Sequence, residues 1–180
     1  ANAVIFLYFL FCGISVFKEG ILIFVHMDKM EKIMNLSLVI ANKRQYLDLL
    51  LLADEQESMI DRYLERGEMF VLEDRGVKAV CVVTDEGSGV CELKNLAVTP
   101  DFQRQGYGRT MINYLINHYS GRYTQMIVGT GDVPGTTGFY KSCGFEYSHR
   151  IENFFTDNYD HPIVEEGILL KDMIYLKQSL

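Results

Sequence analysis

The chain has little cysteine, histidine and proline, with four Cys, four His and three Pro among its 180 residues. No two cysteines form a C-x-x-C pair and the histidines are scattered, so the sequence predicts no metal site. Four cysteines are too few for a disulfide scaffold, and 48% hydrophobic residues exclude a disordered chain. We therefore expect reduced cysteines that act as small apolar side chains in a cytoplasmic protein. They are Cys12, Cys81, Cys91 and Cys143.

Basic residues are also scarce. The chain has 17 Lys and Arg against 24 Asp and Glu, which gives a net charge of −7. A nucleic-acid-binding protein would show the opposite balance, so no nucleic-acid partner is expected. The negative charge favours a cationic or neutral partner. The length suits one globular domain, since domains usually have roughly 100–200 residues.

No hydrophobic run is long enough to span a membrane comfortably. Residues 3–17 carry no charge, but a spanning helix needs about 20 apolar residues, and Lys18 and Glu19 interrupt the run. No basic residue precedes it, as a secretory signal would require. Three interpretations remain: a short element that packs, such as a strand pair turning at residues 18–20; a membrane-associating extension; or a start set too early, with Met27, Met30 and Met34 downstream.

So much apolar surface would form a large patch if it were left in water. We expect residues 1–34 to be an extension that packs against the domain of residues 35–180 or against a second copy of the chain. A homodimer is the commonest way to cover such a patch.

The pattern after residue 35 predicts a mixed α/β domain. Short β-branched runs bounded by turn residues predict strands, and apolar residues at helical spacing predict helices. A long segment at 153–167 is typical of a functional loop. The expected strands are 36–40, 69–72, 77–83, 90–98, 125–128, 145–150 and 168–176, and the expected helices are 46–54, 58–66, 105–120 and 136–142.

The segment from Asn95 to Arg109 carries the informative motif. A strand ends in it, a short turn follows, and Gly106 and Gly108 open a helix. Glycines let the backbone approach a ligand closely, and the free N–H groups and the dipole of a helix N-terminus attract anions. Arg104 and Arg109 could add positive charge. The alternative is a glycine-rich turn that only allows close packing of helix and strand.

Two segments resemble a known family. Gln103-x-x-Gly106-x-Gly108, after a strand ending Leu96-Ala97-Val98, resembles motif A of the GNAT superfamily of N-acetyltransferases. The segment 139–145, Phe-Tyr-Lys-Ser-Cys-Gly-Phe, resembles its second signature. The resemblance covers about residues 36–180. It implies a GNAT-like acyl-CoA N-acyltransferase fold, whose central, mostly antiparallel twisted sheet is splayed at the cofactor site.

The resemblance also implies roles for particular residues. The pyrophosphate of acetyl-CoA would bind to backbone N–H groups, and the pantetheine arm would pair with the preceding strand. Glu92 would be the general base and Tyr140 would protonate the departing thiolate, with no metal involved. One position departs from the family pattern, because Val133 stands where many members have Asn. The expected cofactor-binding residues are Leu96, Ala97, Val98, Arg104, Gln105, Gly106, Tyr107, Gly108 and Arg109.

Each catalytic role fits the chemistry of amine acetylation. An amine attacks a thioester only when it is neutral, so a carboxylate must accept its proton, and a tyrosine hydroxyl can donate to the thiolate. Each also has a structural alternative: Glu92 as a solvated strand carboxylate, and Tyr140 as a packed aromatic. We expect Cys143 to be a packing residue, so that transfer is direct. Phe154, Phe155 and Tyr159 line an acceptor pocket or belong to the core.

The sequence therefore predicts an acetyl-CoA-dependent N-acetyltransferase that acts on a primary amine of a small molecule or peptide. The acidic residues of segment 153–167 favour a cationic acceptor. The alternative is a non-catalytic module that binds or senses acyl-CoA. A nucleotide-binding protein is disfavoured, because no Lys-Ser/Thr pair follows the glycines.

Overall fold

The computed structural model describes residues 15–18, 21–24 and 34–180, and the chain divides into two units, residues 1–33 and 34–180. In the first unit, β1 (Ser15–Lys18) and β2 (Ile21–Phe24) form an antiparallel hairpin in which Lys18 is opposite Ile21. This agrees with the strand-pair interpretation. The other N-terminal residues, on which the expected packing and dimer contact depend, lie outside the described residues. Among the described residues, no helix is long and apolar enough to cross a membrane.

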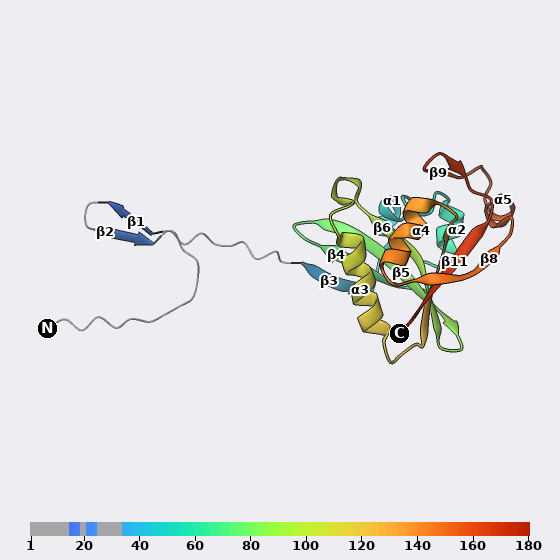
Figure 1. Cartoon of the computed structure of the whole chain (residues 1–180), viewed down its shortest axis with the longest axis horizontal. Coiled ribbons are helices and arrows are strands. Elements are labelled where there is room, and N and C mark those ends of the chain that lie inside the picture. The colour runs from blue at the N-terminus through green and yellow to red at the C-terminus, as the bar shows by residue number, and fades with distance from the viewer. Residues whose placement is uncertain (1–14, 19–20, 25–33) are drawn as a thin grey trace. The chain divides into compact units, whose positions relative to one another are not determined.

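The second unit is built around a seven-stranded sheet (Figure 1). The strand order is β3-β4-β5-β6-β7-β11-β8, and every neighbouring pair is antiparallel except β6 and β7. This confirms the predicted mixed fold with a mostly antiparallel sheet. The strands are β3 (Asn35–Val39), β4 (Glu68–Glu73), β5 (Val77–Gly87), β6 (Val90–Val98), β7 (Gln125–Gly131), β8 (Glu146–Ile151) and β11 (Met173–Ser179).

Both faces of the sheet are buried, because successive side chains of a strand point to opposite faces. In β4, Phe70 and Leu72 belong to the cluster under α3 (Tyr107–Tyr119) and α4 (Pro134–Ser142). Met69 and Val71 belong to the opposite cluster, under α1 (Leu47–Leu50) and α2 (Glu57–Asp61). The three cysteines in this unit are free and buried in the first cluster, which confirms their packing role. Cys12 lies outside the described residues.

The sheet opens between its two central strands. β6 pairs with β7 only from Val90–Gln125 to Leu93–Val128, although β6 continues to Val98 and β7 to Gly131. At the same point β6 contains a bulge, because Val83 is opposite Leu93 and Val82 is opposite Asn95, which leaves Lys94 unpaired. This confirms the predicted splay of the sheet.

Two predicted helices are much shorter than expected. In place of the predicted helix 46–54, a 3-10 turn (Lys43–Tyr46) leads into the four residues of α1, and a further turn follows. In place of the predicted helix 58–66, α2 is followed by turns. The carbonyl of Leu50 accepts the N–H groups of both Ala53 and Asp54, and also the side-chain amide of Asn95. These bonds tighten the chain into a turn, so the helix ends there.

The predicted strand 168–176 is two elements. β9 (Val164–Glu165) pairs with β10 (Ile168–Leu169), and β11 begins only at Met173. Between β10 and β11, Leu170 packs in a third apolar cluster, together with Phe155 of α5 (Phe154–Asn158) and Val133. The space it fills is available because residue 131 is glycine, whose added Cβ would lie 2.7 Å from Leu170 Cδ2.

We predict that Gly67→Ala lowers the free energy of unfolding by about 1–3 kcal/mol. Gly67 ends the turns after α2, and a Cβ there would lie 2.5 Å from Val82 Cγ1. Gly138→Ala is the matched control. Gly138 lies within α4 and has no atom within 4 Å of an added Cβ, so this substitution should raise the free energy of unfolding by about 0.5–1 kcal/mol. Urea denaturation of both variants measures the difference. Equal midpoints for the two variants would contradict the packing argument.

Candidate active site

The loop before α3 has the features of an anion site. A 3-10 turn (Pro100–Phe102) follows β6, and Gly106 precedes the helix with φ of 93° and no side-chain cap. Among residues 34–180, no hydrogen-bond acceptor meets the backbone N–H groups of Arg104, Gln105, Gly106, Gly108 and Arg109. A Cβ added to Gly106 would meet no atom within 4 Å. The loop thus presents several N–H donors at a positive helix end that is open to a ligand.

The second glycine has a packing role. A Cβ on Gly108 would lie 3.2 Å from Phe139 Cζ, so α3 and α4 approach each other closely there. The Arg109 guanidinium donates to Ser142 O at 2.7 Å and to Ser142 Oγ at 2.8 Å, and so binds the end of α4. Of the two interpretations of the motif, close packing therefore describes Gly108, whereas the loop at Gly106 is open and its role in anion binding stays a prediction.

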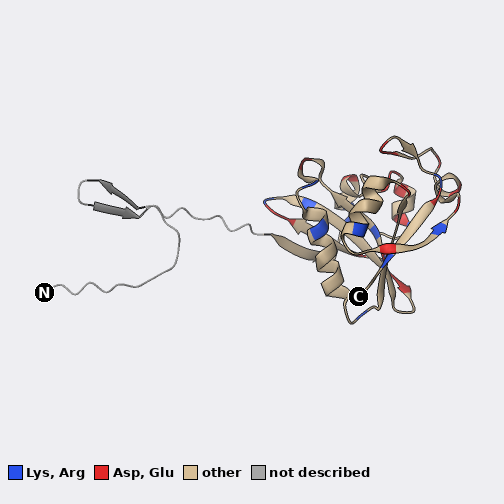
Figure 2. Ribbon diagram, viewed as in Figure 1, with Lys and Arg blue, Asp and Glu red and all other residues tan. Residues whose placement is uncertain are grey.

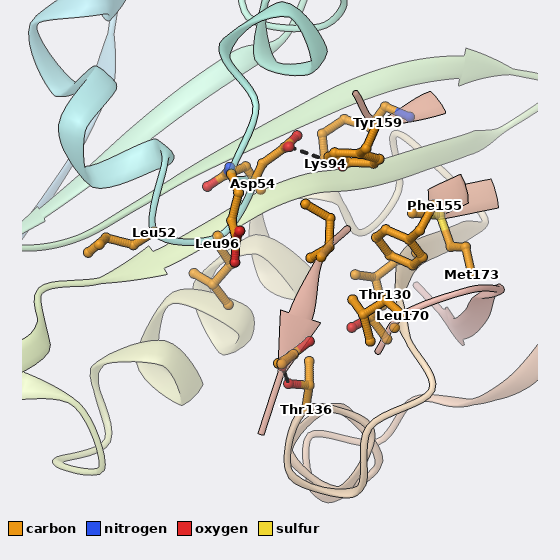
Figure 3. Close-up of a pocket in the computed structure, with 18 of the residues that line it drawn as sticks. Leu52, Asp54, Lys94, Leu96, Thr130, Thr136, Phe155, Tyr159, Leu170 and Met173 are labelled. Carbon is orange, nitrogen blue, oxygen red and sulfur yellow. Dashed lines mark hydrogen bonds between the residues drawn. The ribbon is translucent and has the colours of Figure 1, made fainter. Parts of the chain in front are cut away.

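A cavity of about 320 Å³ lies where β6 and β7 part. Residues 93–96 of β6 and 128–131 of β7 line it, and Leu96 is among them (Figure 3). Neither Ala97 nor Val98 lines the cavity: Val98 packs with the cluster under α3, and Ala97 belongs to the opposite cluster. Beyond Leu93 this edge of β6 has no strand partner among the described residues.

Tyr140 reaches the same cavity from α4. Its side chain is 8% exposed and lies between the rings of Phe139 and Phe145, with centroids 5.1 Å and 5.8 Å away. No group among the described residues hydrogen-bonds its hydroxyl. Burial raises the pKa of Tyr140 above its usual range, so the hydroxyl keeps its proton and can donate it. Tyr140 is thus both a packed aromatic and an available donor.

A second cavity, of about 210 Å³, is lined by α2 and by β6. Five residues line both cavities, so the two are neighbours along one path: Asp54, Lys94, Gly129, Tyr159 and Met173. Phe155 lines the larger cavity and Phe154 the smaller one, and both also pack in the third apolar cluster. These aromatics thus belong to the core and also line cavities, and an acceptor in these cavities stays a prediction.

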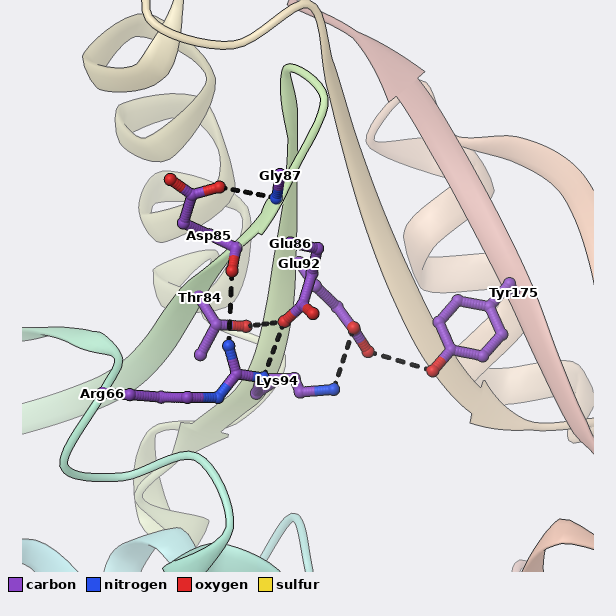
Figure 4. Close-up of polar contacts among 8 residues, drawn as sticks. All are labelled: Arg66, Thr84, Asp85, Glu86, Gly87, Glu92, Lys94 and Tyr175. Atoms are coloured by element: carbon purple, nitrogen blue, oxygen red, sulfur yellow. Dashed lines mark hydrogen bonds and ion pairs between the residues drawn. The ribbon is translucent and has the colours of Figure 1, made fainter.

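Glu92 lines the second cavity and is 7% exposed, so the alternative of a solvated strand carboxylate is wrong. Its Oε1 accepts a hydrogen bond from Tyr175 Oη at 3.1 Å, and Lys94 Nζ lies 2.8 Å from its Oε2 (Figure 4). Tyr175 belongs to β11 and reaches Glu92 across β7 at Gly129. A Cβ on Gly129 would lie 3.0 Å from Tyr175 Cζ, so glycine makes this contact possible.

The position where the family resemblance places an Asn holds an apolar side chain. Val133 is fully buried in the third apolar cluster. Of its neighbours, Asp132 pairs with Arg150, and the Thr136 hydroxyl donates to Glu165. No side chain that could replace the Asn is thus left without a partner in the protein.

The polar residues of the site that were not predicted from the sequence include Asp54, Lys94 and Asn95. Asp54 lies in the turn after α1, where a helix was expected. Lys94 and Asn95 lie at the bulge, which leaves no signature in the hydrophobic pattern. Without the bulge, simple alternation along the strand does not place both Lys94 and Asn95 on the side of Glu92.

Charge is mixed over residues 34–180, with acidic and basic residues interspersed along the ribbon (Figure 2). No group of three His, Cys, Asp or Glu among the described residues could hold a metal ion.

Comparison with known proteins identifies the family. Residues 65–147 match the model of the acetyltransferase (GNAT) domain. The chain is 33% identical over 136 residues to the uncharacterized N-acetyltransferase YvbK of Bacillus subtilis, covering 74% of this chain and 88% of that protein. It is 30% identical over 108 residues to the Escherichia coli [ribosomal protein bS18]-alanine N-acetyltransferase, covering 58% and 70%.

A solved structure gives the same result. A GNAT family acetyltransferase from Elizabethkingia anophelis with acetyl-CoA bound has a TM-score of 0.78 and 33% identity, and the match covers 82% of this chain and 98% of that one. The free N–H groups before α3 and the open edge of β6 fit acetyl-CoA as the cosubstrate. This chain belongs to the GNAT family of acetyl-CoA-dependent N-acetyltransferases.

Proposed function

We propose that the protein transfers the acetyl group of acetyl-CoA directly to a primary amine of a small molecule or peptide. The observation that carries this proposal is the parting of β6 and β7, which opens one cavity toward Tyr140 and joins it to a second cavity lined by carboxylates. The backbone from Arg104 to Arg109 would hold the pyrophosphate, and the free edge at Leu96–Val98 would pair with the pantetheine arm.

In this proposal Tyr140 donates a proton to the departing thiolate. Its support is its place in the cavity and its hydroxyl, which has no hydrogen-bond partner among the described residues. Cys143 is not needed as an acyl carrier. It is buried in the core, and burial raises the pKa of its thiol, which disfavours the nucleophilic thiolate.

The proton of the amine goes to a carboxylate of the second cavity. Glu92 is the base that the family resemblance implies, and this role stays a prediction. Its oxygens are occupied by Lys94 and Tyr175, so it would have to act through water or after rearrangement. Asp54 is the other carboxylate of this cavity.

We further propose a cationic acceptor. The cavity that the amine would enter is lined by Arg62, Arg66 and Lys94 as well as by two carboxylates. Arg66 is paired with Glu86 and Lys94 with Glu92, whereas Asp54 forms no ion pair among the described residues. The E. coli relative is an N-acetyltransferase for alanine of ribosomal protein bS18, and that match covers 58% of this chain. The proposed cytoplasmic location and homodimer rest on the sequence alone. A thiol-release assay over polyamines, aminoglycosides, amino acids and short peptides tests the function and identifies the acceptor class.

Acetyl-CoA should raise the melting temperature, since it binds the folded state. We predict that Gly106→Val weakens acetyl-CoA binding at least 10-fold, because a side chain would fill the open space before α3. Gly121→Val is the matched control. Gly121 also has positive φ, 83°, with no atom within 4 Å of an added Cβ, but it lies at the other end of α3. Titration calorimetry measures both variants, and equal losses would attribute the effect to backbone strain.

We predict that Tyr140→Phe lowers kcat by roughly 10- to 1000-fold, the range expected for loss of a general acid, with acetyl-CoA affinity little changed. The control is Tyr147→Phe, since Tyr147 is an exposed tyrosine of β8 that lines neither cavity. Steady-state thiol release measures kcat for both. Wild-type turnover in Tyr140→Phe would leave Tyr140 with a packing role only.

Deletion of residues 1–26 should leave acetyl-CoA binding intact, because the cofactor residues all lie in the unit 34–180. It should convert a dimer to monomers or reduce solubility, as removal of an apolar contact surface would. Light scattering of both proteins gives their masses in solution. Unchanged mass and stability would show that the segment is dispensable for assembly.

A further inference from the structure

Asp54 lies between the two cavities, in the turn that joins α1 to α2. It is one of the residues that line both. Figure 3 shows Asp54 beside Lys94 and Tyr159, away from Thr136 of α4, which lies at the other end of the larger cavity. An acceptor that enters by the second cavity and reaches toward Tyr140 must therefore pass the Asp54 carboxylate.

Two tyrosine hydroxyls hold this carboxylate in place. Tyr63 Oη donates to Asp54 Oδ2 at 3.2 Å, and Tyr159 Oη donates to Oδ1 at 3.0 Å. Asn95 Nδ2 in turn donates to Tyr63 Oη at 3.1 Å and to Leu50 O at 3.0 Å. A carbonyl only accepts hydrogen bonds, so the Leu50 contact fixes the orientation of the amide. Groups from β6, from the turns after α2 and from segment 153–167 thus fix the position of Asp54.

The carboxylate of Asp54 accepts hydrogen bonds from neutral donors only. Among residues 34–180, no lysine, arginine or histidine forms an ion pair with it, and its direct partners are the two hydroxyls and the Gln56 N–H. Burial raises the pKa of Asp54 above its usual value, although these hydrogen bonds and the positive charge of Arg62 lower it. A partly buried carboxylate whose hydrogen-bond partners are all neutral is stabilised when a cationic ligand arrives.

Glu92 differs from Asp54 in this respect. Its Oε2 is paired with the Lys94 ammonium at 2.8 Å and its Oε1 with the Tyr175 hydroxyl. A second cation would have to displace Lys94 to reach it. Asp54 can receive an ammonium group without breaking an ion pair, so it is the better site for a cationic acceptor.

We propose that the ammonium group of the acceptor binds to Asp54, and that this carboxylate takes the proton whose loss makes the nitrogen nucleophilic. This inference rests on the proposed function. The neutral nitrogen attacks the thioester carbonyl carbon, the C–N bond forms and the C–S bond breaks. The sulfur gains a proton from Tyr140, the nitrogen loses its second proton through water to restore Tyr140, and Asp54 releases its proton to solvent.

The walls around Asp54 indicate the class of acceptor. Met59, Phe154 and Met173 contribute apolar surface to the second cavity, and Tyr159 contributes an aromatic ring beside the carboxylate. The structure thus favours a primary ammonium carried on an apolar or aromatic body. The charged groups that face this region are Glu55, Arg62, Arg66, Glu92 and Lys94, and the tyrosines are Tyr63, Tyr159 and Tyr175.

The test is the pH dependence of kcat/KM, measured by thiol release with the amine of the panel that the wild-type enzyme acetylates fastest. Asp54→Asn should lower kcat/KM by roughly 10²- to 10⁴-fold and remove the acidic limb of the profile. The rise in melting temperature with acetyl-CoA should remain. Asp48→Asn, at an exposed carboxylate of α1 that lines neither cavity, should change nothing.

Tyr159→Phe gives a second readout that keeps the carboxylate. It removes a hydrogen bond that lowers the pKa of Asp54. Because the base works only when deprotonated, activity is lost as pH falls through its pKa, and a higher pKa moves the acidic limb to higher pH. A limb that does not move would overturn the proposal, even if Asp54→Asn failed to fold.

Glu92→Gln separates the two carboxylates. The proposal expects it to keep the acidic limb, whereas a limb that disappears in Glu92→Gln and survives in Asp54→Asn would assign the base to Glu92 and overturn the inference. A wild-type protein that binds acetyl-CoA but releases no thiol with any amine would refute the proposed function itself, and this inference with it.

Discussion

The separation of β6 from β7 is the constraint on which the rest of the site depends. Hydrogen bonds join the two strands only as far as Leu93 and Val128, so the backbone beyond that point needs other partners. The parallel order of these strands requires a long crossover, and α3 supplies it. The N-terminus of α3 therefore begins just after the strand end whose edge is free. Anion-binding N–H groups and an unpaired strand edge come together because one crossover creates both.

The bulge at Lys94 determines which side chains meet in the second cavity. Without it, Asn95 would point to the α3 face, since side chains alternate along a strand. With the extra residue, Glu92, Lys94, Asn95 and Ala97 all contact the α1 and α2 side. Leu93 and Leu96 keep the α3 side and contact the core there. One unpaired residue thus assembles a polar cavity on one face and preserves an apolar core on the other.

The sequence was most informative where the signal is local. The strand 90–98 was predicted with its observed bounds, because alternation and flanking turns define it, and the loop at Gly106 was predicted because a glycine before a helix permits positive φ. Asp54 could not be found in this way. It lies where helical spacing continues past the true end of α1 at Leu50, and its contact with Tyr159 joins residues 105 positions apart. That end depends on the Leu50 carbonyl, which accepts a bond from Asn95 of a distant strand.

The two carboxylates of the second cavity illustrate how the surroundings assign roles to like groups. Glu92 and Asp54 carry the same charge and line the same space, yet one is paired with an ammonium and the other with hydroxyls. Enzymes that need distinct roles from two acids place them in different environments. Here the difference follows from backbone geometry: the bulge presents Lys94 to Glu92, and segment 153–167 presents Tyr159 to Asp54. The tyrosine contacts hold Asp54 without an ion pair among residues 34–180, and in our proposal this leaves a place for a cationic acceptor next to the point where the strands part.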